Sequence, residues 1–175
     1  MVLQIEPIAK TLKEQKEFHL SSGRETHSIL VTPQGRPFSQ EKARELSSKK
    51  AVLTLICGRY EGFDERLRSL VDEEISGGDF ICMGGEVITM TMIETISRLV
   101  PDVLGNQESA VHESFTQPML EFPQYTRPAS FEGMEVPEEL KSGNHKIIAQ
   151  WREEQALART KNRRPELLQC KTKIK

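Results

Sequence analysis

The amino-acid sequence predicts an α/β fold built on a parallel sheet. Two apolar runs, residues 28–32 and 51–57, are rich in β-branched side chains and have the length of buried strands. A helix-like segment separates them, and Ser39 stands where its N-terminal cap belongs. Strand, helix and strand in this order form a βαβ unit, whose parallel strands are covered by helices on both faces.

The elements around this unit follow from hydrophobic spacing and from residues that break it. Residues 5–17 place their apolar side chains on one helical face, and the Ser-Ser-Gly at 21–23 ends this helix. The first strand is expected to end at the turn 33–35, and the next helix to cover about residues 40–48. After the second strand, residues 58–67 predict a loop that runs into a short helix.

A further helix is predicted after a glycine-rich stretch. Four glycines surround the short apolar stretch Phe80–Met83. The segment that follows, up to Pro101, is β-branched, but its apolar spacing favours a helix that Pro101 stops. The residues with this spacing are Val87, Met90, Ile93, Ile96 and Val100.

The C-terminal part combines an irregular segment with helices. Residues 101–136 show no clear period, and so long a stretch in a compact domain is more often functional than idle. Pro137 and Asn144 are expected to open helices. In the second of these helices one side carries Ile148, Trp151, Gln155 and Ala158, and we expect Trp151 in the core rather than as a stacking platform.

Composition limits the class of protein. The 175 residues are 37% hydrophobic and 29% charged, which is typical of a globular domain that buries a core without staples. The sequence has no run of 18 apolar residues and no recognisable signal peptide, so we expect a cytoplasmic protein without a membrane partner. The three cysteines, Cys57, Cys82 and Cys170, lack CxxC spacing, and neither a disulfide framework nor a metal site is expected.

The charge is unevenly distributed. The net charge of −2 divides into −9 for residues 1–140 and +7 for residues 141–175. A basic C-terminal arm on an acidic body indicates a polyanionic partner for the arm. A solvated helix face is the alternative interpretation of the same charges.

Three glycine-containing turns follow strand-like runs, at residues 32–35, 57–62 and 77–86. Each turn alone is more typical of ordinary turn chemistry, but three turns at strand ends predict one shared pocket, because open α/β sheets bind ligands there. None of them matches the GxGxxG or GxxxxGK[ST] pattern, so a Rossmann dinucleotide site or a P-loop has no support. The turns contain no lysine, which favours an adenosine over a phosphate as the ligand.

The chain resembles the bacterial tRNA (guanine-N1)-methyltransferase family over residues 1–170. The resemblance is carried, in order, by the strings CGRYEGFDER, DEEISGGDF, GGE, SRLVPDVLG, ESFTQPMLEFPQYTRP, GMEVPEELKSGNHKII and QWREEQALARTKNRRPELL. It implies an enzyme that uses S-adenosylmethionine to methylate N1 of guanosine 37, directly 3′ of the anticodon. It also implies membership of the SPOUT superfamily of knotted methyltransferases.

The same resemblance implies a domain organisation and a cofactor site. A parallel sheet with a trefoil knot would occupy residues 1–104 and bind the cofactor, residues 105–136 would join the domains, and residues 137–175 would form a small helical tRNA-binding domain. Members of the family are homodimers whose active site lies between the subunits. The residues implied in cofactor binding are Thr32, Pro33, Gly58, Tyr60, Glu61, Gly77, Gly78, Asp79, Phe80, Ile81, Cys82, Gly84 and Gly85.

Methylation of guanine N1 requires a group that removes the N1 proton. The resemblance assigns this role to Glu113, at a place where the family has an aspartate, and assigns to Arg98 the support of the base and of the charge that develops on O6. The residues alone leave alternatives open. Glu113 is also read as a solvated surface carboxylate, Arg98 as a partner of a helix C-terminal dipole, and His112 as a substitute base.

The basic arm fits contacts with the tRNA backbone, and the arginines expected to make them are Arg152, Arg159, Arg163 and Arg164. Family members begin with an additional strand–helix–strand segment, so residues 1–8 are expected to correspond to the middle of a domain. A catalytically silent, truncated tRNA-binding or dimer-forming remnant is therefore the main alternative function. A SPOUT 2′-O-methyltransferase that acts on ribosomal RNA is a further one.

Overall fold

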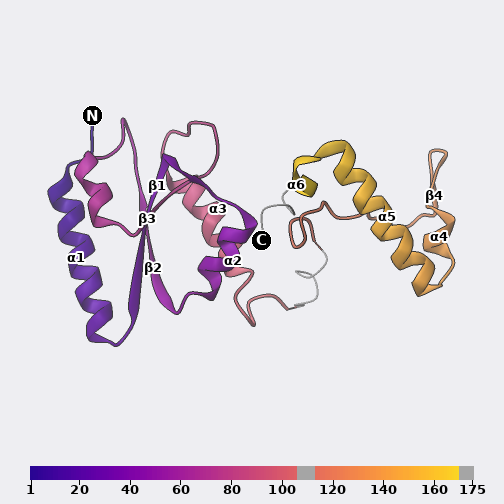
Figure 1. Ribbon diagram of the computed structural model, residues 1–175, viewed down its shortest axis with the longest axis horizontal. Helices are drawn as coiled ribbons and strands as arrows, with labels where there is room; N and C mark the ends of the chain where they lie inside the picture. Colours follow the sequence, from indigo (N-terminus) through magenta and orange to yellow (C-terminus); the bar gives the residue numbers. More distant parts are fainter. Residues whose placement is uncertain (106–112, 170–175) are drawn as a thin grey trace. The chain divides into compact units, whose positions relative to one another are not determined.

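The computed structural model describes residues 1–105 and 113–169 (Figure 1). The chain divides into two compact units, Met1–Gly105 and Asn106–Lys175, and each is described by itself.

The first unit is built on a three-stranded parallel sheet. Strand β1 (Glu25–Pro37) lies in the centre, with β2 (Ala51–Cys57) on one side and β3 (Glu73–Ser76) on the other. Ile29 is opposite Leu55 in β2 and opposite Glu73 in β3. The parallel α/β fold that the sequence predicts is therefore confirmed.

Two details of the sheet differ from the sequence-based expectation. Strand β1 does not end at the turn 33–35 but continues to Pro37, with a shift of register between Val31 and Arg36 where it passes β3. The four-residue strand β3 was not predicted, because it begins with two glutamates and only Ile75 and Ser76 are buried. A bulge in β1 thus takes the place of the expected turn.

Helices cover both faces of this sheet. Figure 1 shows α1 (Ile5–Ser21) and the short 3₁₀ helix η1 (Glu65–Leu70) on one side of the strands, and α2 (Gln40–Ser48) and α3 (Glu86–Ser97) on the other. The predicted cap is confirmed, since the backbone amide of Lys42 donates a hydrogen bond of 3.2 Å to Ser39 Oγ.

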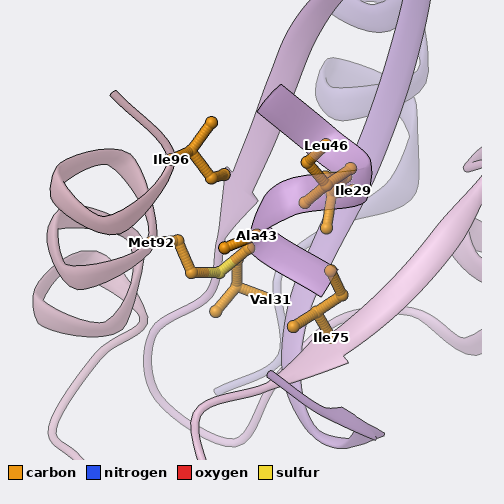
Figure 2. Packing of buried hydrophobic residues seen from close by; sticks show 7 residues of the cluster. All are labelled: Ile29, Val31, Ala43, Leu46, Ile75, Met92 and Ile96. Atoms are coloured by element: carbon orange, nitrogen blue, oxygen red, sulfur yellow. The ribbon is translucent and has the colours of Figure 1, made fainter. Parts of the chain in front are cut away.

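The core lies between the sheet and the helices α2 and α3 (Figure 2). Its buried members come from β1, β3, α2 and α3, namely Ile29, Val31, Ala43, Leu46, Ile75, Met92 and Ile96. Leu30, between two of these residues, is outside this cluster and equally buried, as alternation along a strand requires. Burial on both faces explains why β1 is almost entirely apolar at its centre.

Helix α3 is confirmed, but of the apolar residues that predicted it only Ile96 is buried. Thr89, Met92 and Ile96 form its buried side. Val87, Met90 and Ile93 are 64%, 68% and 49% exposed. The helix therefore has two apolar faces, and only one of them is covered by the described residues of this unit.

A charged cluster joins β1, β3 and α2. The carboxylate of Glu73 lies between two basic side chains. Its Oε1 is 2.7 Å from His27 Nε2, and its Oε2 is 2.5 Å from Lys42 Nζ. Burial alone would raise the pKa of Glu73, but the hydrogen bonds from Lys42 and His27 outweigh it and hold that pKa below its usual value. For Lys42 the directions are reversed. Burial alone would lower its pKa, but the hydrogen bonds to Glu73 and Glu45 outweigh burial, and the pKa of Lys42 is raised.

We expect Glu73→Gln to lower the melting temperature at pH 7, because Lys42 and His27 lose a half-buried partner. A carboxylate with a depressed pKa stabilises the folded state above its usual pKa, and this stabilisation is lost as the pH falls through the folded-state value. The difference between variant and parent should therefore shrink in acid. Melting curves between pH 7 and pH 3 measure this. Glu25→Gln, an exposed change on the neighbouring strand β1, is the control; a constant difference at all pH values contradicts the expectation.

The second unit is predominantly helical. Its elements are the hairpin strands β4 (Ser130–Phe131) and β5 (Met134–Glu135), α4 (Glu138–Lys141), α5 (His145–Arg163) and α6 (Glu166–Gln169). Pro137 and Asn144 stand at the starts of α4 and α5, as predicted, and Asn144 Oδ1 accepts a 3.0 Å hydrogen bond from the amide of Lys146.

The core of this unit forms along α5. Trp151 is buried, as expected, together with Ala156 and Thr160, whereas Ala158, expected on the same side, is exposed. The hydroxyl of Thr160 donates to the carbonyl of Ala156 at 2.7 Å and accepts from the amide of Leu120 at 2.9 Å. Through these two hydrogen bonds, the hydroxyl links the irregular segment at Leu120 to helix α5.

Candidate functional site

A hollow of about 510 Å³ lies at the carboxyl ends of the three parallel strands. All three glycine-containing turns contribute to its wall. Of the residues that the sequence assigns to a cofactor site, those in the lining are Thr32, Pro33, Gly58, Tyr60, Glu61, Gly77, Gly78, Phe80, Ile81, Cys82, Gly84 and Gly85. Asp79 is not among the lining residues, although its neighbours on both sides are. The cofactor-binding role of Asp79 and of the lining residues stays a prediction.

Backbone hydrogen bonds hold two of the turns together. The amide of Gly85 donates to the carbonyl of Gly58 at 2.8 Å, and an isolated β-bridge joins Arg59 to Gly84. Beneath them, Cys57 Sγ and Thr89 Oγ1 lie 2.9 Å apart. The end of β2 and the start of α3 are thereby fixed against each other.

Glycine is required where these backbones meet. A Cβ on Gly85 would lie 3.2 Å from the backbone nitrogen of Gly58, and one on Gly35 would lie 2.5 Å from the backbone nitrogen of Ile75. The first contact is tighter than ordinary van der Waals packing and the second is impossible without moving β3. These glycines therefore determine how closely the turns approach one another.

The two arginines that line the hollow are already paired with carboxylates. Arg59 Nε lies 2.6 Å from Glu86 Oε1. A hydrogen bond from the backbone of Glu86 to its own carboxylate, together with the bond from Arg59, lowers the pKa of Glu86. Arg68 contacts Glu65 at 2.8 Å and also contacts Glu74 of β3 and the amide oxygen of Gln34. Neither guanidinium is therefore a spare cation for a bound anion.

Carboxylates also line the hollow. Glu61, Asp64 and Glu65 belong to its wall. A hydrogen bond from the Arg66 side chain, followed by one from the Arg66 amide, lowers the pKa of Asp64 to about 2. These carboxylates are paired as well, Glu61 with the N-terminal amine of Met1 at 2.8 Å and Asp64 with Arg66 at 2.7 Å. The wall therefore offers no unpaired arginine to balance an anionic ligand.

Sequence reasoning missed several residues of this wall, among them Gln34, Phe63, Asp64 and Arg68. Arg68 reaches the hollow because it bridges η1, β1 and β3. The sequence offers one weak signal for it, the i, i+3 spacing from Glu65 on the predicted short helix.

The residues predicted to act on the substrate are divided between the two units. Arg98 is half-buried at the C-terminal end of α3, where its amide donates to Glu94 at 3.3 Å, and it does not line the hollow. Glu113 is half-buried in the second unit, and its carbonyl accepts a 3.2 Å hydrogen bond from the amide of Thr116. His112 lies outside the described residues. The catalytic roles of Arg98 and Glu113 stay predictions.

The four arginines predicted to contact tRNA have different surroundings. Arg159 donates to the carbonyl of Glu121 at 3.3 Å, and Arg164 pairs with Glu166. Arg163 is exposed at the end of α5. Arg152 lies over the ring of Phe122, 4.6 Å from its centroid.

Cys57 and Cys82 are free thiols, and Cys170 is outside the described residues. In the part of the chain that the structure describes, no three His, Cys, Asp or Glu side chains are grouped to hold a metal ion. None of the described helices is both long enough and apolar enough to cross a bilayer.

An open parallel sheet with a glycine-lined hollow at its carboxyl edge defines the ligand-binding α/β class of proteins. Within this class the family model described as tRNA (Guanine-1)-methyltransferase TrmD matches residues 1–170. The chain belongs to this family, which confirms the resemblance found in its sequence strings.

Curated relatives carry the name tRNA (guanine-N(1)-)-methyltransferase. The relative from Syntrophotalea carbinolica is 53% identical over 171 residues, covering 97% of this chain and 66% of the relative. The relative from Symbiobacterium thermophilum is 53% identical over 169 residues, with coverage of 97% and 68%. The relative from Staphylococcus haemolyticus is 53% identical, with coverage of 96% and 66%. This chain therefore spans about two thirds of the length of the curated relatives it matches.

Proposed function

We propose that this chain acts as an S-adenosylmethionine-dependent tRNA methyltransferase that transfers a methyl group to N1 of guanosine 37, 3′ of the anticodon. The observation that carries this proposal is the hollow formed by the three glycine turns in a member of the tRNA (guanine-1)-methyltransferase family. The names of the relatives support the same reaction and the same kind of substrate.

The hollow fits the proposed methyl donor in size and in charge. Its volume of about 510 Å³ is within the usual range of small-molecule sites. The donor supplies a methyl group on a positively charged sulfur, and a wall whose two arginines are both paired with carboxylates leaves no free cation to repel that charge. The absence of side chains at Gly58 and Gly85 lets the adenosine approach the main chain of both turns closely.

In this mechanism Glu113 accepts the proton from guanine N1 as the methyl group arrives. Arg98 stabilises the negative charge that shifts to guanine O6, as a fixed cation does best in a site that excludes water. A glutamate keeps the carboxylate of the family's aspartate and adds one methylene. We infer that the irregular segment around Glu113 absorbs this difference in reach.

A second copy of this chain is the partner we propose for the exposed face of α3. Val87, Met90 and Ile93 present three apolar side chains to solvent on that face, and Met83 and Ile81, just before the helix, are 95% and 80% exposed. An apolar surface of this kind beside a ligand site is typical of a protein interface. A homodimer with the hollow close to the shared surface accounts for it.

The trefoil knot of the SPOUT superfamily and a cytoplasmic location complete the proposed assignment. The membership of the family supports the knotted fold. A tRNA substrate supports the location.

The basic arm supports a tRNA partner, and it predicts a salt dependence. We expect Arg163→Gln to reduce the slope of log affinity against log salt concentration by about 1, because one phosphate contact is lost. Lys13→Gln, an exposed change on α1, should leave the slope unchanged. Anisotropy titrations of labelled tRNA at several salt concentrations measure both slopes. An Arg163→Gln slope equal to that of the parent contradicts the arm's role.

Two measurements test the proposed function. Calorimetry with S-adenosylhomocysteine tests the hollow, and the absence of binding would favour the catalytically silent remnant. Primer extension on tRNA incubated with the protein and the donor tests the reaction, because N1 methylation blocks Watson–Crick pairing whereas 2′-O-methylation does not. A stop next to guanosine 37 is the expected result. Binding without a stop would leave a cofactor-binding protein that is not a guanine-N1 methyltransferase.

A further inference from the structure

The second unit contains a small hollow of its own. It measures about 230 Å³ and lies between residues 122–126, α4 and α5. Half-buried apolar side chains, including Leu140 and Ile148, contribute to its wall, and Gln124 and Thr126 are exposed around it. All of its lining residues belong to this unit, so the hollow is independent of the cofactor site.

Arg152 enters this hollow already stacked on an aromatic ring. Its guanidinium lies 4.6 Å from the centroid of the Phe122 ring, and both residues line the hollow. Among the described residues, no carboxylate forms an ion pair with Arg152, which is exposed. One face of the planar cation is therefore held by Phe122, and its other face and its N–H groups are available to a ligand.

Tyr125 adds a second flat surface. Its ring centroid is 6.2 Å from that of the buried Trp151, at an interplanar angle of 57°, and 47% of Tyr125 is exposed. The contact with Trp151 fixes the ring on one side, because Trp151 is part of the core of α5. An aromatic ring and a guanidinium that the fold already holds in place lose little conformational entropy when a flat ligand stacks on them.

We infer that this hollow binds one unstacked nucleobase of the tRNA, with the base stacked against Arg152 and Tyr125 and its adjoining phosphate near the guanidinium. This inference rests on the proposed function for the identity of the partner. Proteins that recognise single-stranded RNA stack splayed bases on aromatic rings and arginine planes. A volume of about 230 Å³ suits one base rather than a larger ligand, and the Gln124 amide and Thr126 hydroxyl can donate to or accept from its edge.

This role differs from a phosphate contact, and the difference can be measured. Arg152→Lys keeps the positive charge but removes the plane that stacks. For a stacked base, we expect Arg152→Lys to weaken tRNA binding about 5- to 100-fold with an unchanged salt slope. Tyr125→Leu should weaken binding to a similar extent, whereas Tyr125→Phe keeps the ring and should retain the parent affinity. The probe is an unmodified tRNA transcript in anisotropy titrations, with Arg24→Lys as the control exchange on the first unit.

A set of tRNAs, each with one abasic site at an unpaired position, identifies the base. Removal of the recognised base should weaken binding to the parent more than it weakens binding to Arg152→Lys, because that variant has already lost one of the base's contacts. At every other unpaired position the loss should be equal for the two proteins. Circular dichroism melting curves check that the variants fold. Parent affinity in both Arg152→Lys and Tyr125→Leu, in a chain that methylates tRNA, overturns this inference and leaves the proposed function standing. A parent chain that binds no tRNA overturns both.

Discussion

Replacing Glu113 by glutamine is expected to abolish methylation of tRNA. Glutamine has nearly the same shape as glutamate but cannot accept the proton that guanine N1 must lose. A general base contributes about 10²- to 10⁴-fold to a rate, so a single-turnover methylation assay should show a loss of at least about 100-fold. Because the cofactor hollow belongs to the first unit, calorimetry should give an unchanged affinity for S-adenosylhomocysteine.

Two variants make this result specific to the carboxylate. Glu113→Asp keeps the acid and restores the residue type of the family, so it should retain turnover. Glu139→Gln, the same exchange at an exposed position of α4, should methylate at the parent rate. Turnover by Glu113→Gln at the parent rate would show that another group removes the proton.

The second large effect is expected from Gly35→Ala, a change of one methyl group. The added Cβ would lie 2.5 Å from the backbone nitrogen of Ile75 and 2.6 Å from the carbonyl carbon of Glu74. Both atoms belong to β3, whose backbone cannot withdraw without breaking its pairing with β1. Overpacking costs about 1–3 kcal/mol, which corresponds to a melting temperature lower by about 3–10 °C.

The same change should weaken cofactor binding. A displaced β3 shifts Ser76 and Gly77, and the β1 bulge shifts Thr32 and Gln34, and all four residues line the hollow. Thermal melting and calorimetry with S-adenosylhomocysteine measure the two effects. Gly105→Ala is the matched control, because a Cβ at Gly105 meets no atom within 4 Å. Equal melting temperatures for Gly35→Ala and the parent would mean that β3 yields without cost.

The sequence predicted the βαβ unit because its signals are local. The apolar runs of β1 and β2 are buried by the same sheet that they form, and Ser39 caps α2 within one turn. Strand β3 escaped prediction because its two glutamates are half-buried beside partners elsewhere in the chain, Lys42 for Glu73 and Arg68 for Glu74. Such pairing depends on tertiary contacts that no window of sequence contains.

Periodicity predicted helix α3 correctly but did not show which face is buried. Val87, Met90 and Ile93 repeat with helical spacing as clearly as the buried residues do, so the pattern alone could not tell the core side from the side we assign to a second copy. Similarly, three glycine turns at strand ends were enough to predict a shared hollow, but not the side chains that reach it from η1, such as Arg68. The hollow beside Arg152 had no sequence signal, because Phe122 and Arg152 meet only when the irregular segment folds against α5.

The paired arginines at the carboxyl edge of the sheet have a consequence for selection among the adenine compounds of a cell. ATP, ADP and AMP share the adenosine moiety of the proposed donor but add anionic groups, and Arg59 and Arg68 are already neutralised by Glu86, Glu65 and Glu74. These nucleotides would find no unpaired arginine in the wall to balance their phosphates, so electrostatics disfavours them although they share the adenosine. An adenosine analogue with an amine in place of the sulfonium adds no anionic group, and this is the inhibitor chemistry to which such a pocket is best suited.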